Sequence, residues 1–245
     1  MITPLYGSEG PMRVAGFMSG SGTNIVKLIE HELQHLGAYS IEVLFTDKPT
    51  KSKTEEIASK YKIPWLGLPY IGFFNELGLD HKDPNNTFLF YKRVHSMLRP
   101  FDVHAIALGG YMRIVPASFL GAFPLTVNVH PADLAIRNVN GGRRYTGDDA
   151  VSLVMADRLA TIRSTTHLMT SEVDGGPLLL CSAPMQLDYG RTPAENQSSL
   201  KEAGDWKIFP LTLEMIATRR FARDETGLVH LDGTPIPDGK KLEEL

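Results

Sequence analysis

Short apolar runs alternate with helical stretches through the first 108 residues of the chain. The runs 14–18, 41–45 and 103–108 have the length and composition of buried strands. Two neighbouring strands can pair in parallel only when a crossover, usually a helix, returns the chain to the same edge of the sheet. The alternation therefore predicts an α/β fold with a mostly parallel sheet and flanking helices.

The remaining elements follow from periodicity and from Gly and Pro positions. We expect an extended piece over 65–68 and a long loop over 69–86, where Gly and Pro interrupt polar residues. That loop either shapes a substrate entrance, forms an oligomer contact or is a tolerated insertion. The further expected helices are 53–61, 88–98, 146–159 and 205–221, and the further expected strands are 162–169 and 178–182.

Composition limits the domain count and the kind of partner. With 245 residues and 42% hydrophobic content the chain can bury one sizeable core. We predict a single domain over 1–245, with a loose lead-in over 1–11 and a hairpin and tail over 222–245. A net charge of -3 without a basic cluster argues against nucleic acid, and no apolar run is long enough to cross a membrane. Small molecules are therefore the expected partners, and both a monomer and a homodimer stay open.

The single cysteine, Cys181, excludes an internal disulfide framework and fits a reducing compartment. The first residues also lack the charged and then apolar pattern of a secretory signal. Both observations favour a cytoplasmic location. Cys181 lies in an apolar run, so we expect it to be inert packing.

A glycine loop follows the first strand. Its sequence is Ser-Gly-Ser-Gly-Thr-Asn at 19–24, and a helix follows with an apolar stripe of Ile25, Leu28, Ile29, Leu33 and Leu36. Backbone N–H groups at a helix N-terminus form a natural phosphate cradle, so Ser21, Gly22, Thr23 and Asn24 are candidate phosphate ligands. The alternative is a glycine turn that merely reverses the chain. It is not a complete dinucleotide motif, because Ile25 stands where the third glycine would be.

The same helix contains His31-Glu32-Leu33-Gln34-His35, which matches the H-E-x-x-H pattern of zinc proteases. Both histidines fall well away from the centre of the apolar stripe, so we expect them to face solvent or the rim. A catalytic zinc needs a third ligand, and no partner with suitable spacing is evident. We therefore predict no metal site.

The stretch 126–131 is the strongest candidate for chemistry. Alternation along a strand sends Asn128 and His130 to the same face, and an amide beside an imidazole suits a carbonyl carbon under attack. Asp174, in a glycine-flanked turn, is the best candidate to orient and charge the imidazole. The alternatives are a packed strand histidine and an ordinary Asp-Gly turn.

Four motifs together carry a resemblance. The loop at 19–24, Gly-Tyr-Met-Arg-Ile-Val at 110–115, Asn-Val-His-Pro at 128–131 and Val-Asp-Gly-Gly-Pro at 173–177 occur in the order and rough spacing of one family. Over about residues 12–215 the chain resembles the 10-formyltetrahydrofolate-dependent formyltransferases, especially the branch that formylates phosphoribosylglycinamide. That resemblance implies the formyltransferase fold, a mostly parallel, Rossmann-like twisted sheet flanked by helices, with the active site where the strand ends meet.

The resemblance also implies roles for single residues. Asn128 would bind the formyl oxygen, His130 would be the acid/base, and Asp174 would raise the His130 pKa. His167 would support this site, with a plain packed histidine as the alternative. The implied binding residues are Ser21, Gly22, Thr23 and Asn24 for the substrate phosphate, Arg113, Ile114, Val115, Asn128, Val173 and Asp174 for the folate, and Asp205 for the substrate amine.

The implied activity is transfer of a formyl group from the co-substrate 10-formyltetrahydrofolate to the amine of a small phosphorylated acceptor, with phosphoribosylglycinamide of purine biosynthesis as the expected one. The loop 132–147 departs from the family pattern, and Thr87 stands where relatives carry an arginine. These differences leave three alternatives open: a different amine acceptor, a formyltetrahydrofolate hydrolase and a non-catalytic folate-binding relative. Within that loop Arg143 and Arg144 either contact phosphate or carboxylate groups or are ordinary exposed charges.

Overall fold

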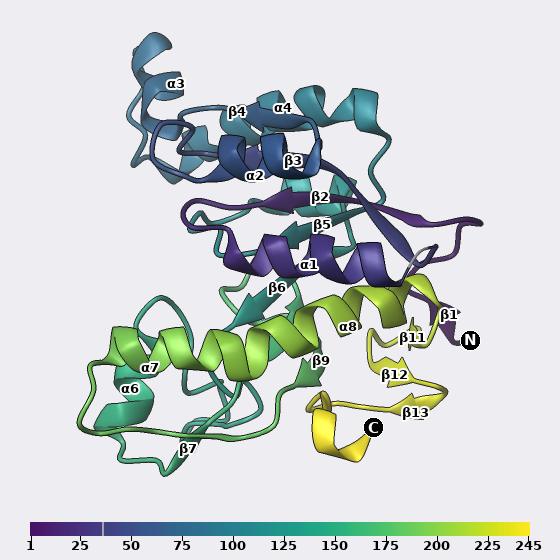
Figure 1. Ribbon diagram of the computed structural model, residues 1–245, viewed down its shortest axis with the longest axis vertical. Coiled ribbons are helices and arrows are strands. Elements are labelled where there is room, and N and C mark those ends of the chain that lie inside the picture. Colours follow the sequence, from purple (N-terminus) through teal and green to yellow (C-terminus); the bar gives the residue numbers. More distant parts are fainter. Residues whose placement is uncertain (36) are drawn as a thin grey trace. The chain divides into compact units, whose positions relative to one another are not determined.

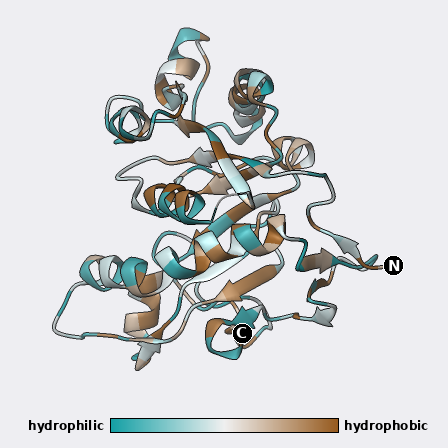
Figure 2. Ribbon diagram, turned by 45° about the vertical axis from the view of Figure 1, so that its right-hand side comes forward, coloured by the Kyte–Doolittle hydropathy of each residue, from teal (hydrophilic) through white to brown (hydrophobic). Residues whose placement is uncertain are grey.

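The structure, a computed structural model, describes residues 1–35 and 37–245. It divides into two compact units, which are described separately below: Gly10–Thr126, and Met1–Glu9 together with Val127–Leu245. Figure 2 shows that hydrophobic residues concentrate on strands and on one side of several helices. Within the described ranges, no helix is long and apolar enough to cross a membrane.

The unit Gly10–Thr126 contains a parallel sheet with the strand order β5-β2-β3-β4. Its strands are β2 (Met12–Phe17), β3 (Tyr39–Thr46), β4 (Trp65–Gly67) and β5 (Ala105–Leu108), and its helices are α1 (Thr23–Gln34), α2 (Thr54–Tyr61), α3 (Tyr70–Glu76), α4 (Thr87–Leu98) and α5 (Ala117–Ala122), with short 3-10 turns at Pro84–Asn86 and Arg99–Phe101. Strand–helix alternation along this unit (Figure 1) confirms the predicted α/β class with a mostly parallel sheet and flanking helices.

The predicted loop over 69–86 is wrong in its first half, because residues 70–76 form α3. Tyr70 and Phe74 are buried on one side of this helix, and the Tyr70 ring lies 4.8 Å from that of Phe90 on α4. Aromatic residues three and four positions apart build an apolar helix face, and its burial outweighs the low helix propensity of Gly72.

Most of the predicted stripe on α1 is confirmed. Ile25, Leu28 and Ile29 are buried, but Leu33 is 61% exposed, and Leu36 lies outside the described residues. His31 is half-buried and His35 is exposed, and their rings stack at 4.1 Å. No group of three or more His, Cys, Asp or Glu side chains in the described part of the chain could hold a metal.

The unit that contains Val127–Leu245 has the strand order β6-β8-β9-β14. Strands β6 (Thr126–His130), β8 (Thr165–Leu168) and β9 (Leu178–Cys181) pair antiparallel, and β14 (Lys240–Lys241) pairs parallel with β9. The predicted strand 162–169 is split, since β7 (Thr161–Ile162) ends before β8 and pairs with β10 (Met185–Gln186). Burial raises the pKa of the Cys181 thiol, on β9, to about 12.

Three helices belong to this unit. The helix predicted over 146–159 is shorter, α6 (Ala150–Ala156), and α7 (Pro193–Leu200) was not predicted. A capping box between Thr192 and Glu195 starts α7, and a π-helical turn over Lys201–Asp205 leads into α8 (Trp206–Ala217). Figure 1 shows α7 and α8 as one nearly continuous helix.

The two ends of the chain are paired with strands of the same unit. The predicted lead-in contains β1 (Thr3–Pro4), which pairs with β11 (Phe221–Arg223), and the predicted hairpin consists of β12 (Val229–Leu231) and β13 (Thr234–Pro235). In the predicted tail, β14 is followed by a 3-10 turn, Leu242–Glu244. Arg163 forms a salt bridge to Glu243 of that turn with a 2.6 Å contact. That the whole chain is one domain stays a prediction.

His230 on β12 forms a titratable pair with Asp224, which directly follows β11; their Nε2 and Oδ2 atoms are 3.0 Å apart. The hydrogen bond to Asp224 raises the pKa of His230. The pair therefore stabilises the fold fully below the unfolded histidine pKa of about 6.5, and this contribution is lost as the pH rises through the higher folded value. His230→Gln should lower the melting temperature more at about pH 5.5 than at about pH 8.5.

The matched control is Arg220→Gln, which removes a salt bridge between Arg220, directly before β11, and Asp232, in the turn between β12 and β13. Neither of those groups changes charge between the two pH values, so its loss in melting temperature should be equal at both. An equal loss for His230→Gln as well would contradict the expected pH dependence.

Candidate active site

Strands β6 and β8 bring three predicted side chains together. Their antiparallel register places Asn128 opposite His167 and His130 opposite Thr165. Because side chains alternate between the faces of a strand, Asn128, His130 and His167 share one face of the sheet. His130 and His167 are buried, and Asn128 is half-buried.

A tight turn places Asp174 beside this face. Asp174 has a left-handed backbone with φ of 50°, a conformation that Asp tolerates better than most residues. A Cβ atom on Gly176 would lie 1.8 Å from the carbonyl oxygen of Leu168, so only glycine allows the turn to pack against the end of β8.

The Asp174 carboxylate lies between the two histidines. Its Oδ2 is 3.4 Å from Nδ1 of His130, and its Oδ1 is 3.5 Å from Nε2 of His167. The backbone N–H of Gly147 donates a hydrogen bond of 2.7 Å to Oδ2. Burial alone would raise the pKa of Asp174, but the two histidines and the Gly147 N–H outweigh it and lower the pKa to about 2. Asp174 is therefore ionised at neutral pH.

Two opposing effects act on His130. Burial lowers its pKa, and the Asp174 carboxylate raises it, with burial the larger effect. Asp174 thus raises the His130 pKa as predicted, but burial of a ring that is only 4% exposed is the larger effect and makes the net shift downward. In the neutral ring, Nε2–H donates to the carbonyl oxygen of Tyr145 at 2.7 Å, which leaves Nδ1 opposite Asp174.

His167 orients the Asn128 amide. Its Nδ1 lies 3.1 Å from the carbonyl oxygen of Leu168, which can only accept, so in the neutral ring Nδ1 carries the hydrogen. Nε2 lies 3.1 Å from Nδ2 of Asn128 and 3.5 Å from Oδ1 of Asp174, so this ring atom faces both the amide and the carboxylate. The contact with Nε2 uses one amide N–H of Asn128, and the second is left to donate elsewhere.

Asp205, the residue predicted for the substrate amine, lies in the π-helical turn and is 3% exposed. Its carboxylate accepts a short hydrogen bond from the hydroxyl of Ser164, between β7 and β8. This contact gives no support to the amine role. Val173, by contrast, is 50% exposed in the turn before Asp174.

In the unit Gly10–Thr126, the predicted phosphate and folate segments meet at Asp47, which follows β3. Ser19 donates to Oδ1 of Asp47 at 2.6 Å, and Nε of Arg113 lies 2.7 Å from Oδ2. The Arg113 guanidinium also covers the Tyr70 ring at 4.1 Å. Sequence reasoning missed Asp47, although a carboxylate directly after a buried strand was a usable signal.

The remaining predicted residues of this unit differ in exposure. Ile114 is 71% exposed, whereas Val115 is 2% exposed. In the glycine loop, Gly22 has φ of 67° directly before α1, and Ser21 is exposed.

Arg143 and Arg144 are both engaged within the protein. Arg143 donates to the backbone carbonyls of Asp174 and Gly176, and Arg144 forms a salt bridge with Asp157 in which Nε lies 2.5 Å from Oδ2. For Arg143 the structure supports neither predicted alternative, a contact to phosphate or carboxylate groups or an ordinary exposed charge, because its guanidinium donates to backbone carbonyls of the Asp174 turn.

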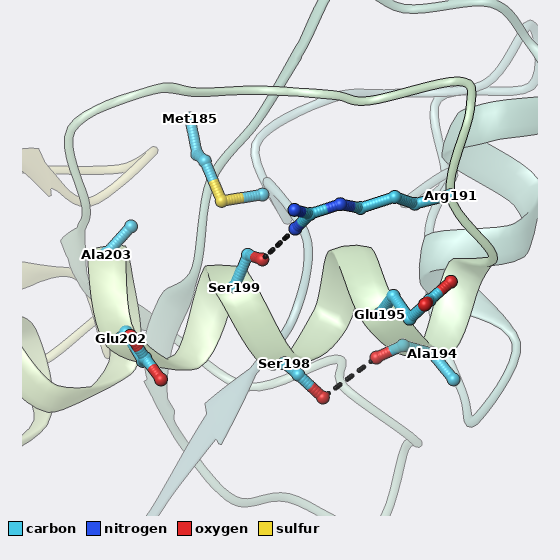
Figure 3. Close-up of a pocket in the computed structure, with 8 residues that line it drawn as sticks. All are labelled: Met185, Arg191, Ala194, Glu195, Ser198, Ser199, Glu202 and Ala203. Atoms are coloured by element: carbon cyan, nitrogen blue, oxygen red, sulfur yellow. Dashed lines mark hydrogen bonds between the residues drawn. The ribbon is translucent and has the colours of Figure 1, made fainter.

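A surface pocket along α7 contains none of the predicted site residues. Arg191 and Ser199 face each other across it, with a hydrogen bond of 3.4 Å (Figure 3). Nothing in its lining resembles the amide, imidazole and carboxylate group described above.

Comparisons with known proteins identify the family of the chain. The formyl transferase family matches residues 12–213. The chain is 24% identical over 218 residues to the trifunctional purine biosynthetic protein adenosine-3 of Homo sapiens, covering 89% of this chain and 19% of that protein. It is 26% identical over 168 residues to phosphoribosylglycinamide formyltransferase of Bacillus subtilis, covering 68% of this chain and 76% of that enzyme. The chain thus spans about a fifth of the length of the first of these relatives.

Solved structures share the fold. The phosphoribosylglycinamide formyltransferase of Coxiella burnetii superposes with a TM-score of 0.75 at 22% identity, over 94% of this chain and 99% of that one. A formyltetrahydrofolate deformylase of Pseudomonas syringae gives a TM-score of 0.71 at 13% identity, over 90% and 66%. Because the family match extends over most of its length, the chain belongs to the formyl transferase family.

Proposed function

We propose that this protein transfers the formyl group of 10-formyltetrahydrofolate to the amine of phosphoribosylglycinamide, a step of purine biosynthesis. The observation that carries the proposal is the group of Asn128, His130 and Asp174, an amide donor and an imidazole on one face of β6 and an ionised carboxylate in the turn that follows β8. Membership of the formyl transferase family supports the donor, and the names of the Bacillus and Coxiella relatives support the acceptor.

In the proposed reaction, the neutral amine attacks the formyl carbon, and a C–N bond forms while negative charge moves onto the carbonyl oxygen. The free N–H of the Asn128 amide donates to that oxygen. The His130–Asp174 pair takes the proton that the amine loses, and a proton returns to N10 of the folate as its bond to the formyl carbon breaks. The lowered pKa of His130 favours a ring that is neutral, and so able to accept a proton, when the reaction begins.

Binding roles follow from the same proposal. We assign the acceptor phosphate to Ser21, Gly22, Thr23 and Asn24 at the N-terminus of α1, a helix of 12 residues whose first N–H groups have no partner within the helix. The folate is assigned to residues 113–115 and to the turn that contains Val173 and Asp174.

Hydrolysis is the second candidate, because a deformylase shares the fold with a TM-score of 0.71. Water in place of the amine would use the same amide, imidazole and carboxylate. Incubation with 10-formyltetrahydrofolate, with and without phosphoribosylglycinamide, separates the two reactions. We expect formylated product that depends on the amine, measured by mass spectrometry, and little formate without it.

Formate release at the same rate with and without the amine would indicate a hydrolase. Tight folate binding without turnover would indicate a non-catalytic relative. A panel of phosphorylated amines in the same assay tests the acceptor, and turnover with another amine alone would replace phosphoribosylglycinamide in the proposal.

A further inference from the structure

The loop 132–147 contains a small hairpin with its own internal hydrogen bonds. Arg137 and Arg143 form an antiparallel bridge, and the backbone N–H of Arg144 donates to the carbonyl of Ile136 at 3.0 Å. At the tip, the Asn138 side chain accepts from the N–H groups of Asn140 at 2.9 Å and Gly142 at 3.1 Å. These bonds fix the direction in which Arg143 leaves the hairpin.

The Arg143 guanidinium reaches the Asp174 turn with two separate donors. Nη1 donates to the carbonyl oxygen of Asp174, and Nη2 donates to that of Gly176 at 2.6 Å. Charged hydrogen bonds of this kind are among the stronger ones, and the planar fork fixes the spacing of its two acceptors. Arg143 is half-buried, which strengthens both bonds.

The turn needs such support because of its backbone. Asp174 is one of the few residues with positive φ that is not glycine, and this conformation is unfavourable for L-residues in isolation. The contacts of its carboxylate to His130 and His167 are also sensitive to small displacements, because they are already 3.4 and 3.5 Å long. A shift of the turn would therefore weaken both.

We infer that Arg143 is a positioning residue, which holds the Asp174 turn by its two carbonyls and so maintains the contact between Asp174 and His130. The inference rests on the proposed function for its effect on catalysis, but its structural part can be tested without any turnover. Arg143 makes no proposed contact to either substrate. It acts through the backbone of the turn.

Arg143→Lys is the most informative variant, because lysine keeps the positive charge but cannot bridge two carbonyls with a planar fork. The matched control is Arg137→Lys on the same hairpin, where the guanidinium forms an exposed salt bridge with Asp238 at 3.2 Å, and lysine keeps the positive charge that Arg137 places near Arg143. Histidine ring signals followed by NMR across pH report the state of His130 directly. The charged and titratable groups around Asp174 are His130, His167, Arg143 and Glu172.

In Arg143→Lys we expect the pKa of His130 to fall below the wild-type value, because the Asp174 carboxylate no longer stays close. With both substrates, kcat should fall on the order of tenfold with an unchanged KM for the amine, since a displacement of about 1 Å can cost as much as about 10²-fold. Arg137→Lys should match the wild type in both measurements.

Two results would overturn the inference. One is a His130 titration in Arg143→Lys identical to that of Arg137→Lys, whether or not kcat falls. The other is a rise in KM for the amine with kcat unchanged, which would make Arg143 a substrate ligand. If the wild type transfers no formyl group to any amine, the proposed function fails, yet the NMR comparison still decides the positioning role.

Discussion

Asn128→Ala is expected to lower kcat by about 10²- to 10³-fold while the protein stays folded. The amide is the side-chain donor that we place on the developing oxyanion, and His167 holds one of its hydrogens at 3.1 Å so that the other is presented without reorganisation. Asn128 is half-buried, so alanine leaves little empty space. Single-turnover rates and thermal melting of the same sample separate catalysis from stability.

Asn75→Ala, at an exposed position in the last turn of α3, is the control and should leave both quantities at wild-type values. A kcat for Asn128→Ala within about threefold of the wild type, set against the 10²-fold expected for an oxyanion donor, would remove the amide from the mechanism.

Gly176→Ala should be the most destabilising single substitution in the active-site turn. Its new Cβ would lie 1.8 Å from the carbonyl oxygen of Leu168, which is backbone and cannot rotate away as a side chain could. The turn must move, and with it Asp174. We expect a loss of about 3 kcal/mol or more in the free energy of unfolding, measured by urea titration, together with lower activity below the melting temperature.

Gly121→Ala is the control, for which we expect no loss in the free energy of unfolding. Gly121 lies in α5, nothing is within 4 Å of its added Cβ, and its φ is not positive. Alanine there should be neutral or stabilise by as much as about 1 kcal/mol. If Gly176→Ala were equally well tolerated, the close packing of the turn against β8 would not limit which residue can stand at 176.

Local periodicity predicted much of the site. Alternation along residues 126–130 is enough to place Asn128 and His130 on one face, because the period of a strand is fixed by its geometry, whereas His167 shares that face through the pairing of β6 with β8. Asp174 came from a glycine-flanked turn together with the family resemblance. The arrangement of its carboxylate between two histidines depends on antiparallel register, which no local pattern contains.

Two kinds of feature could not be predicted from the sequence: contacts made by backbone groups, and the net result of opposing effects on a pKa. Tyr145 and Gly147 contact His130 and Asp174 through a carbonyl and an N–H, which every residue type has, so their identities carry no signal. The direction of the His130 pKa shift is the difference between burial and charge, and burial is known only once the fold is known. The missed helix α3 likewise forms because tertiary contacts with Phe90 override local propensity.

The buried thiol has a practical consequence for spectroscopy. With a pKa of about 12, Cys181 carries almost no thiolate at neutral pH, and the thiolate is the form that reacts with maleimides. Val139 is 97% exposed at the tip of the hairpin that carries Arg143. The variant Val139→Cys would therefore take up a fluorescent or spin label selectively, and Cys181 need not be replaced. Motion of this hairpin could then be followed in the otherwise unaltered protein while ligands are added.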